Sequence, residues 1–329
     1  MSALAPTLQA FFTERLISQR RASAHTVAAY RDAFCLLLRF VERRTGRAAA
    51  ALEIEDLNAK LVGAFLDHLE RDRHNSVRTR NARLSAIHSL LRFAVLRHPE
   101  HAASIERVLA IPPKRFERKI VCFLTDDEVD ALLAAPDRRS FLGRRDHALL
   151  LLAIQTGLRV SELVGLKGHD IVLGTGAHVR CSGKGRKERT TPLTATTSDV
   201  LKAWLKVRRG ELDHPLFPTR QGTALSRYGV TVLVARHVKV AAARCPSLAV
   251  KNVSPHVLRH TAAMRLLHAG VDTVVIALWL GHESVETTQI YVHADMSLKE
   301  RALARTIPIG DKPGRYRPPD QLLAFLEGL

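Results

Sequence analysis

Apolar residues recur at three- and four-residue steps through much of the first hundred positions, which is the period of an amphipathic helix. The segment 23–46 has the clearest pattern, because its apolar side chains keep that period until Gly46, a typical helix stop. Segments 56–72 and 76–97 repeat the pattern. It predicts a small all-helical bundle over about the first 110 residues.

The helical period breaks at 110–125, where two prolines and four basic residues are typical of an interdomain linker. A new helix is predicted to begin at Thr125, because Glu128 three positions later completes a capping box. The apolar segment that follows ends at Gly157, which suits a helix C-cap. A second domain therefore starts near residue 125.

Apolar residues switch to a period of two between 171 and 193, on both sides of a turn rich in glycine and lysine. This arrangement predicts a β-hairpin. Helical patterns resume over 197–210 and 254–270, and Ser254 is the expected N-cap of the second of these. The predicted fold is mainly α with a small β-hairpin or sheet.

These breaks divide the chain into a helical domain of residues 1–112, a linker of 113–124, a second domain of 125–307 and a C-terminal tail of 308–329. The tail joins a Pro/Gly-rich spacer to a short apolar segment. A short apolar helix needs a groove that covers it. Docking on its own subunit and docking on a neighbouring subunit are equally open.

Charge narrows the class of partner. The chain holds 50 Lys and Arg against 32 Asp and Glu, a formal net charge of +18. Residues 1–115 contribute 19 basic and 11 acidic residues, a net charge of +8, which leaves +10 for the remainder. Such a field attracts polyanions, most often nucleic acid. A basic housekeeping protein, such as a ribosomal factor, is the alternative that charge alone leaves open.

Cysteines and apolar runs bear on the compartment. The four cysteines lie far apart with no CxxC spacing, which favours buried free thiols in a reducing compartment over disulfides or zinc ligands. The first residues lack the order of a signal peptide, and the longest apolar runs are too short to span a bilayer. We expect a cytoplasmic protein that does not bind membranes.

Two basic motifs in the second domain are candidates for chemistry. In TGLRVSEL, Arg159 follows a helix end, and its guanidinium could bind phosphate oxygens or simply face solvent. In SGKGRKER, glycines allow close approach of a ligand, and Lys184 lies at the predicted tip. Gly185 follows that lysine, so a nucleotide-binding P-loop is disfavoured, and a mobile basic hairpin stays open.

The motif HVLRH places His256 and Arg259 on one face of a helix, where both could act on one anion. His260 completes a histidine pair four residues apart, but a zinc-protease motif needs glutamate where Val257 stands. Farther along, LGH ends in His282 and IYVH contains Tyr291. A single histidine or tyrosine is usually a packing residue, whereas five basic groups and a tyrosine in this order are not.

Together TGLRVSEL, GKGRKER, HVLRH, LGH and IYVH resemble the motif series of the tyrosine recombinases, the phage-integrase and Xer-like family. The resemblance covers roughly residues 8–305. It includes TRNARLSAIHSLLRF in the first domain, which looks like the core-binding domain of that family. Each motif is weak alone, but the combined pattern is specific.

The resemblance implies an enzyme that cleaves and rejoins DNA strands through a 3′-phosphotyrosyl bond. It makes Tyr291 the nucleophile, His256 the acceptor of the tyrosine proton and Lys184 the general acid for the leaving 5′-oxygen. Because the covalent bond stores the energy of the broken linkage, neither ATP nor a metal is needed, and no cofactor is expected.

The same resemblance assigns phosphate binding to three further residues. Arg159 and Arg259 would bind the non-bridging oxygens of the phosphorane, and His282 would donate another hydrogen bond. The wider DNA-binding surface is predicted from basic residues on the polar face of 76–97, in the linker and in the hairpin turn: Arg78, Arg80, Arg83, Lys114, Arg115, Arg186 and Lys187.

The expected partner is double-stranded DNA, bound by a homotetramer on two duplexes whose tails are exchanged between subunits. The continuation after Tyr291 and the tail beyond Arg305 favour the integrase or transposase of a mobile element. A chromosome-dimer resolvase of the Xer type is the alternative. A catalytically idle DNA-binding protein and a type IB topoisomerase also share this fold or chemistry, but the full motif set argues against the former, and the helical first domain and tail against the latter.

Overall fold

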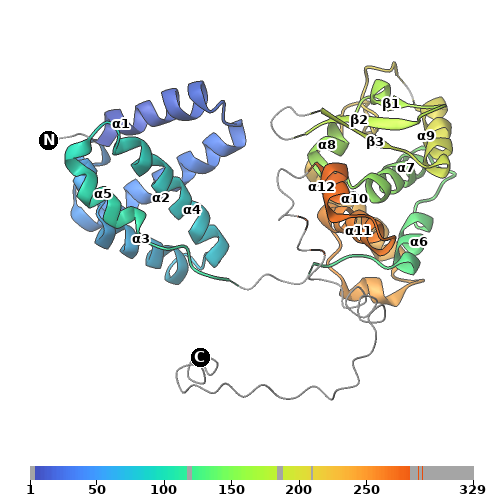
Figure 1. Cartoon of the computed structure of the whole chain (residues 1–329). Coiled ribbons are helices and arrows are strands. Elements are labelled where there is room, and N and C mark those ends of the chain that lie inside the picture. The colour runs from blue at the N-terminus through green and yellow to red at the C-terminus, as the bar shows by residue number, and fades with distance from the viewer. Residues whose placement is uncertain are drawn as a thin grey trace, which may run out of the picture. The chain divides into compact units, whose positions relative to one another are not determined.

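The computed structural model describes residues 4–116, 121–183, 188–208, 210–281, 288 and 291. Within these residues the chain is mostly helical with one small sheet, as the sequence predicts (Figure 1). The chain forms two compact units, residues 1–119 and 120–329. No helix in the described part is both long and apolar enough to cross a membrane.

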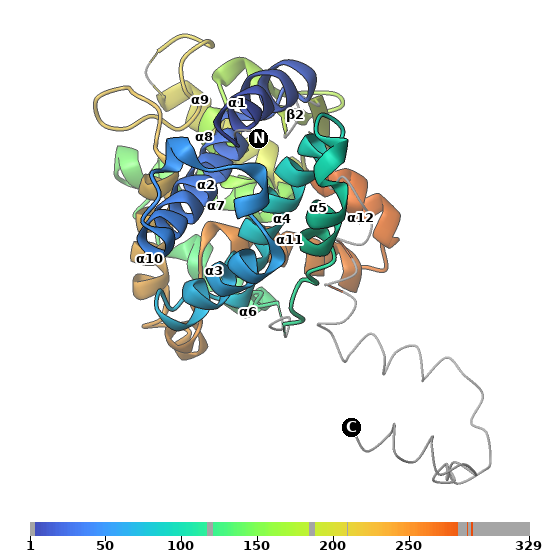
Figure 2. The same cartoon turned by 90° about the vertical axis from the view of Figure 1, so that its left-hand side faces the viewer.

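The first unit is a helical bundle. It consists of α1 (Leu4–Ala10), a π-helical segment (Phe11–Gln19), α2 (Ala24–Thr45), α3 (Ala59–Arg71), α4 (Val77–Ala94) and α5 (Ala102–Leu109), with short 3₁₀ turns at Ala49–Ala51, Ile54–Asp56 and Pro99–His101. Helix α4 packs against α2, α3 and α5 (Figures 1 and 2). The buried side chains of Phe11, Phe34 and Phe65 belong to one apolar core. The predicted all-helical bundle is confirmed.

Local capping explains where these helices begin and end. The side chains of Ser23, Asn58 and Ser76 accept hydrogen bonds from backbone N–H groups of the first turns of α2, α3 and α4. Helix α2 ends at Gly46, whose φ of 69° is the left-handed conformation that favours glycine. The stop predicted at Gly46 is confirmed.

Arg80 departs from the expectation that it lies on the polar face of its helix. It is only 6% exposed. Its Nη1 donates to Asn81 Oδ1 at 3.0 Å and to the carbonyl of Pro112 at 3.2 Å. The guanidinium therefore ties α4 to the chain that leaves the bundle, and the expectation of an exposed Arg80 on the polar face is wrong.

The second unit combines a small sheet with helices. Its helices are α6 (Asp126–Ala134), α7 (Phe141–Thr156), α8 (Val160–Gly165), α9 (Ala195–Val207), α10 (Arg227–Ala241), α11 (Pro255–His268) and α12 (Thr273–Leu280), with 3₁₀ turns at Gly168–Asp170 and Pro246–Val250. Helix α7 is central, packing against both α9 and α11. Trp204 of α9 is buried, and its Nε1 donates to the carbonyl of Leu216 at 2.9 Å.

The sheet has three antiparallel strands in the order β1 (Ile171–Val172), β2 (His178–Ser182) and β3 (Glu188–Pro192). Val179 pairs with Ile171 on one side and with Thr191 on the other. The predicted hairpin is thus extended by one short strand. Its turn, residues 184–187, lies outside the described residues.

Three predicted helix signals in this unit have different outcomes. The capping box at Thr125 is confirmed, since its N–H donates to Glu128 Oε2 at 2.8 Å and its Oγ1 accepts from the Glu128 N–H. Gly157 ends α7 with a φ of 64°, as predicted. Ser254 occupies the N-cap position of α11, but its side chain makes no capping hydrogen bond.

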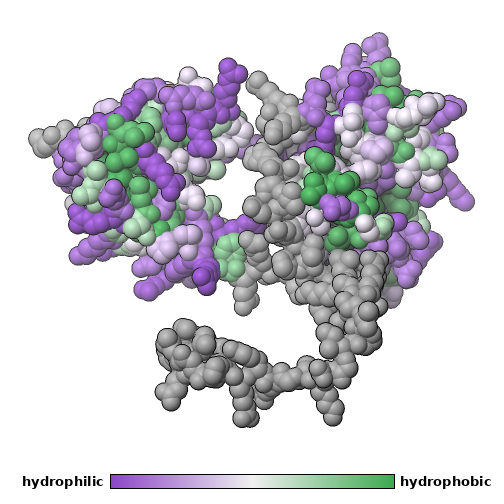
Figure 3. All heavy atoms as spheres, viewed as in Figure 1, coloured by the Kyte–Doolittle hydropathy of each residue, from purple (hydrophilic) through white to green (hydrophobic). Residues whose placement is uncertain are grey.

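The described surface includes two exposed thiols and an apolar patch. The four cysteines are free, but Cys35 and Cys122 are exposed and Cys245 is half-buried, so the expectation of buried thiols is confirmed for Cys181 alone. Helix α12 exposes the side chains of Val274, Val275 and Leu278, which contribute to an apolar patch on the second unit (Figure 3).

Candidate active site

A glycine without room for a side chain lies at the base of the candidate site. A Cβ atom at Gly157 would lie 2.5 Å from Leu280 Cδ2 and 3.1 Å from Ala262 Cβ. The tight turn from α7 into α8 therefore packs directly against α11 and α12. It brings the Gly157 carbonyl to Arg259 and places Arg159 at the N-cap of α8.

Arg259 is held rigidly from α11. Its Nη1 donates to the Gly157 carbonyl at 2.7 Å, and its Nη2 donates to the Leu280 carbonyl at 2.8 Å. The residue is 3% exposed, and burial, with nearby Arg159, lowers the pKa of its guanidinium to about 10. The group stays charged at neutral pH, and its orientation is fixed by two backbone carbonyls.

Arg159 is placed beside it with a different exposure. Its Nη1 donates to Glu162 Oε1 and its Nη2 to the Gly281 carbonyl, each at 2.9 Å. The side chain is 32% exposed. Part of this guanidinium therefore remains open to a ligand. The alternative that the sequence left open, an arginine that only faces solvent, does not describe a side chain held by two hydrogen bonds.

Glu162 is the acidic centre that supports these cations, and motif reasoning did not assign it a role. It accepts from the side chain and backbone N–H of Arg159 and, through both oxygens, from Arg189 of β3 at 3.0 and 2.8 Å. Burial alone would raise the pKa of this carboxyl, but the hydrogen bonds from Arg189 and Arg159 hold it below its ordinary value. The sequence feature that could have identified Glu162 is its position three residues after Arg159.

Gly281 closes this arrangement from the end of α12. Its φ is 65°, and a Cβ atom there would lie 2.8 Å from Arg189 Nη1. Its carbonyl accepts from Arg159. Glycine is needed at this position because the backbone is left-handed and the Arg189 guanidinium occupies the adjacent space.

Tyr291 lies within the same unit and is 2% exposed. It packs in a small apolar cluster with Met264, Ile276 and Leu280. Burial raises the pKa of its phenol, while the positive charges of Arg259 and Arg159 act in the opposite direction. The structure therefore brings the predicted nucleophile into the field of both predicted phosphate-binding arginines.

The Tyr291 hydroxyl forms a hydrogen bond with His260 Nδ1 at 3.0 Å. His256, one helical turn earlier, is exposed, and its ring centroid lies 4.2 Å from that of His260. The resemblance assigned the tyrosine proton to His256, whereas the hydrogen bond described for the hydroxyl joins it to His260. The sequence feature that could have identified His260 is its spacing of four residues from His256 in HVLRH. Lys184, His282, Arg186 and Lys187 lie outside the described residues.

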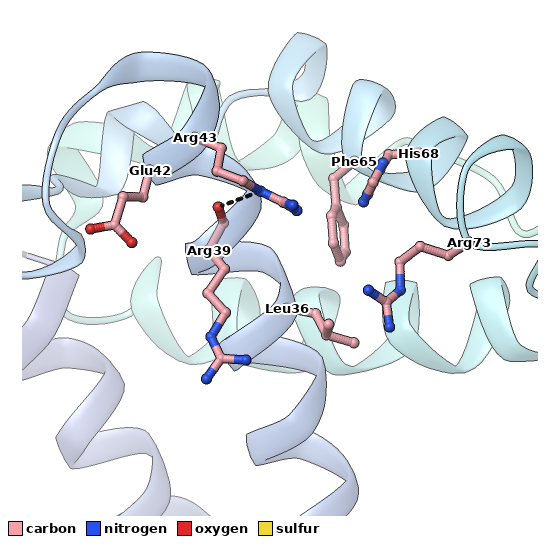
Figure 4. Close-up of a pocket in the computed structure, with 7 residues that line it drawn as sticks. All are labelled: Leu36, Arg39, Glu42, Arg43, Phe65, His68 and Arg73. Carbon is pink, nitrogen blue, oxygen red and sulfur yellow. Dashed lines mark hydrogen bonds between the residues drawn. The ribbon is translucent and has the colours of Figure 1, made fainter.

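A basic pocket of about 290 Å³ lies on the first unit, in a region that motif reasoning did not select. Arg43, Phe65, His68 and Arg73 converge on its space, while Glu42 points away (Figure 4). The remaining lining residues are Leu36 and Arg39.

The other described residues of this unit that were predicted to contact DNA do not line this pocket. Arg83 is partly buried, and burial together with nearby Arg73 lowers the pKa of its guanidinium. Arg78 and Arg115 are exposed. Lys114 is also exposed, but its Nζ donates to Glu70 at 2.6 Å.

Comparison with protein families matches both units. Residues 122–297 match the phage integrase family, and residues 10–98 match the phage integrase N-terminal SAM-like domain. A Sinorhizobium fredii protein named integrase/recombinase y4rC is 56% identical over 328 residues, covering 100% of this chain and 99% of that protein. Tyrosine recombinase XerC of Pelobacter propionicus is 35% identical over 289 residues, covering 87% and 90%.

The fold is also similar to that of a solved recombinase. A crystal structure of the XerH site-specific recombinase bound to a palindromic difH substrate has a TM-score of 0.66 and 21% identity, covering 87% of this chain and 81% of that one. With both domain models matched and a relative more than half identical along the whole chain, the protein belongs to the phage integrase family of tyrosine recombinases.

Proposed function

We propose that this protein is a site-specific recombinase that cleaves and rejoins DNA through a 3′-phosphotyrosyl intermediate. The observation that carries the proposal is the position of Tyr291 in the field of Arg159 and Arg259. A buried phenol beside two fixed cations suits attack on a phosphodiester, because the cations stabilise the negative charge that develops during the reaction.

The two arginines are suited to different parts of phosphate binding. Arg259 is oriented by two backbone carbonyls before any ligand arrives, so little reorganisation is needed when charge develops. Arg159 is more exposed, and Glu162 and Gly281 hold it on one side. We assign both to the non-bridging oxygens of the scissile phosphate.

The remaining catalytic roles rest on the family resemblance. Lys184 would protonate the leaving 5′-oxygen, and His282 would donate a hydrogen bond to the phosphate. His256, which is exposed on the same helix as Arg259, would accept the proton of the attacking tyrosine. The reaction needs no metal or nucleotide cofactor in this scheme.

Double-stranded DNA is the proposed substrate and partner. The net charge of +18 supports it, and the basic pocket lined by Arg39, Arg43 and Arg73 adds a phosphate-binding surface to the predicted contacts at Arg78 and Arg83. A tetramer on two duplexes, with residues 308–329 docked on a neighbouring subunit, remains our proposed assembly. Its proposed compartment is the cytoplasm, and the proposed boundaries remain 1–112, 113–124, 125–307 and 308–329.

Integration or excision of a mobile element is the favoured biological role. The relative with 56% identity carries the name integrase/recombinase, which supports it. The relative named XerC, at 35% identity, supports chromosome-dimer resolution as the second candidate. Recombination between the ends of the DNA that flanks the gene would favour the first, and recombination only at a chromosomal dimer-resolution site would favour the second.

The test is Tyr291→Phe on a nicked suicide substrate, which traps the covalent complex. The wild-type protein is expected to form a protein–DNA adduct, and the variant is expected to bind the DNA equally well without forming one. Phe keeps the ring that fills the apolar cluster and removes only the hydroxyl. An adduct that persists in the variant would contradict the proposal.

A further inference from the structure

We propose that Arg189 of β3 is a positioning residue for Arg159, the partly exposed arginine that we assign to the scissile phosphate. The inference rests on the proposed function and adds to it a residue that acts through another side chain. Arg189 fixes the carboxylate of Glu162, which holds Arg159. It also packs against Gly281, whose carbonyl holds the same guanidinium. Arg189 ends the motif GKGRKER, from which it received no role.

The strand pattern directs Arg189 into the second unit. Side chains alternate between the two faces of a strand, and the less exposed side chains of β3 are those of Arg189 and Thr191. Across the hairpin, Arg189 pairs with Cys181, which is 6% exposed. The side chain of Arg189 is itself only 12% exposed. An arginine on this face therefore needs an acceptor within the protein.

The acceptor is Glu162, whose lone pairs are divided between two arginines. Arg189 donates through Nη1 to Oε1 at 3.0 Å and through Nη2 to Oε2 at 2.8 Å. Arg159 donates to the same two oxygens, through its Nη1 to Oε1 at 2.9 Å and through its backbone N–H to Oε2 at 2.7 Å. A carboxylate offers about four lone pairs, so these four hydrogen bonds occupy all of them.

This division makes the orientation of the carboxylate depend on Arg189. A guanidinium fork that donates to both oxygens of a carboxylate fixes the plane of that carboxylate. The terminal torsion of a glutamate otherwise has only a broad, roughly two-fold preference. With the plane set by Arg189, one lone pair of each oxygen of Glu162 stays directed at Arg159. Without the fork, the carboxylate would be free to rotate, and Arg159 would lose a defined acceptor.

Arg189 also packs against the backbone that holds the other end of the Arg159 guanidinium. A Cβ atom at Gly281 would lie 2.8 Å from Arg189 Nη1 and 3.2 Å from its Cζ. The carbonyl of the same glycine accepts from Arg159 Nη2 at 2.9 Å. Arg189 therefore supports both of the acceptors described for the Arg159 side chain.

Arg189 is suited to orient Arg159 rather than to bind the phosphate itself. Burial alone would lower the pKa of the Arg189 guanidinium, but the hydrogen bonds and charge of Glu162 raise it above its ordinary value. Arg189 therefore stays charged and offsets the buried carboxylate. Its fork is occupied by Glu162, whereas the side chain of Arg159 is 32% exposed.

Two variants test the proposal by single-turnover adduct formation on the nicked substrate. Arg189→Met keeps the aliphatic stem and removes the fork, and it is expected to slow adduct formation by about 10²-fold, the usual effect of misplacing a catalytic group. Arg189→Lys keeps the charge without the fork and should slow it by a smaller factor. The matched control is Arg180→Met, because exposed Arg180 of β2 donates to the His169 carbonyl and to neither Glu162 nor Gly281 in the described contacts. It is expected to keep the wild-type rate.

A neutral scissile group separates the positioning of Arg159 from a general loss of structure. In a methylphosphonate, a methyl group replaces one non-bridging oxygen, so the transition state carries one negative charge fewer and depends less on Arg159. Arg189→Met is therefore expected to slow adduct formation by a much smaller factor on this substrate than on the phosphate. Equal factors on the phosphate and on both methylphosphonate stereoisomers would overturn the proposal, because a structural defect does not depend on the charge of the substrate.

A double-mutant cycle gives a second readout. If Arg189 acts through Arg159, adding Arg189→Met to Arg159→Ala should slow adduct formation little beyond Arg159→Ala alone. Two losses that multiply would overturn the proposal, and so would a wild-type rate in Arg189→Met. Thermal unfolding and DNA affinity show whether each variant is folded, and Arg189→Lys carries the same tests if Arg189→Met does not fold. If the wild-type protein forms no adduct on the phosphate, the proposed function itself fails, which is a different result.

Discussion

Arginines are used differently in the two units of this protein. In the catalytic unit, Arg259 is buried and bound by two carbonyls, and Arg159 is held by Glu162 and Gly281. In the basic pocket of the first unit, Arg39 and Arg73 are exposed, and neither forms an ion pair among the residues that the structure describes. The first pair is oriented before DNA arrives, while the second keeps its rotational freedom.

The difference between fixed and exposed arginines corresponds to two functions: fixed arginines suit catalysis, and exposed arginines suit attraction of DNA. Fixed cations stabilise charge that develops at one point, and each is worth a large factor in rate. Exposed cations bind phosphates by releasing counterions, and each contributes a modest, salt-dependent part of the affinity. Substitutions in the two groups are therefore expected to change different measurements by different amounts.

The largest effect is expected from Arg259→Lys. Lysine keeps the charge but cannot make the two directed hydrogen bonds to Gly157 and Leu280 or present a planar fork to phosphate. We expect single-turnover adduct formation to fall by about 10²- to 10³-fold while DNA affinity stays close to wild type. Quenched-time-course gels and fluorescence anisotropy measure the two quantities.

The matched control for this substitution is Arg265→Lys on the same helix. Arg265 pairs with exposed Asp126 at 2.9 Å and touches neither Arg159 nor Tyr291 in the described contacts. It is expected to keep the wild-type rate. Equal rates for Arg259→Lys and Arg265→Lys would remove the distinction between oriented and solvent-facing arginines in this unit.

A smaller effect is expected from Glu162→Gln, which removes the charge shared by Arg159 and Arg189. Breaking a buried ion pair leaves cations unpaired, so the free energy of unfolding at pH 7 should fall by on the order of 3 kcal/mol. Adduct formation should also slow, because Arg159 loses part of its support. Chemical denaturation and single-turnover rates measure both.

The loss in free energy of unfolding caused by Glu162→Gln is expected to depend on pH, and its direction follows from the lowered pKa of Glu162. Since the folded chain holds the pKa of Glu162 below its ordinary value of 4.5, the charged carboxylate stabilises the fold above that value. The stabilisation is lost as the pH falls through the lowered folded pKa. The stability difference between wild type and Glu162→Gln should therefore narrow in acid. Glu211→Gln, at an exposed carboxyl, serves as control, and a difference independent of pH would contradict the assignment.

The smallest effect is expected from Arg39→Ala and Arg73→Ala in the basic pocket. Each should weaken DNA binding a few-fold at about 0.1 M salt and lower the slope of log affinity against log salt by about 1. The rate of adduct formation at saturating DNA should not change. Anisotropy titrations at several salt concentrations measure the slope.

Arg47→Ala is the matched control in the first unit. Arg47 donates to both carboxylate oxygens of Asp56 at 2.8 Å and to the Ala51 carbonyl, so its guanidinium is already occupied. Its removal should leave the salt slope nearly unchanged. If it lowers the slope as much as Arg73→Ala, the basic pocket is not a preferred phosphate-binding surface.

Signals confined to a few neighbouring residues were predictable from the sequence. The glycine stops at Gly46 and Gly157 and the capping box at Thr125 depend on backbone groups within about one helical turn. The mainly helical fold with a small sheet follows from hydrophobic period alone. The third strand was missed because β1 has only two residues.

Features that depend on distant contacts were not predictable in the same way. Arg80 has the spacing of a surface residue, but the Pro112 carbonyl that holds it is 32 positions away. The hydrogen bond between His260 and Tyr291 joins residues 31 apart, so the sequence interpretation, which assigned the tyrosine proton to His256, did not identify it. Glu162 binds Arg189, 27 positions later, across a fold that no local pattern specifies.

The most direct test of the central claim is mass spectrometry of the trapped adduct. After nuclease and trypsin digestion, the peptide of residues 266–299 contains Tyr291 as its only tyrosine. We predict that fragmentation places a 3′-linked nucleotide on Tyr291. A nucleotide on any other residue, or no modified peptide from wild-type protein on a cleavable site, would contradict the account.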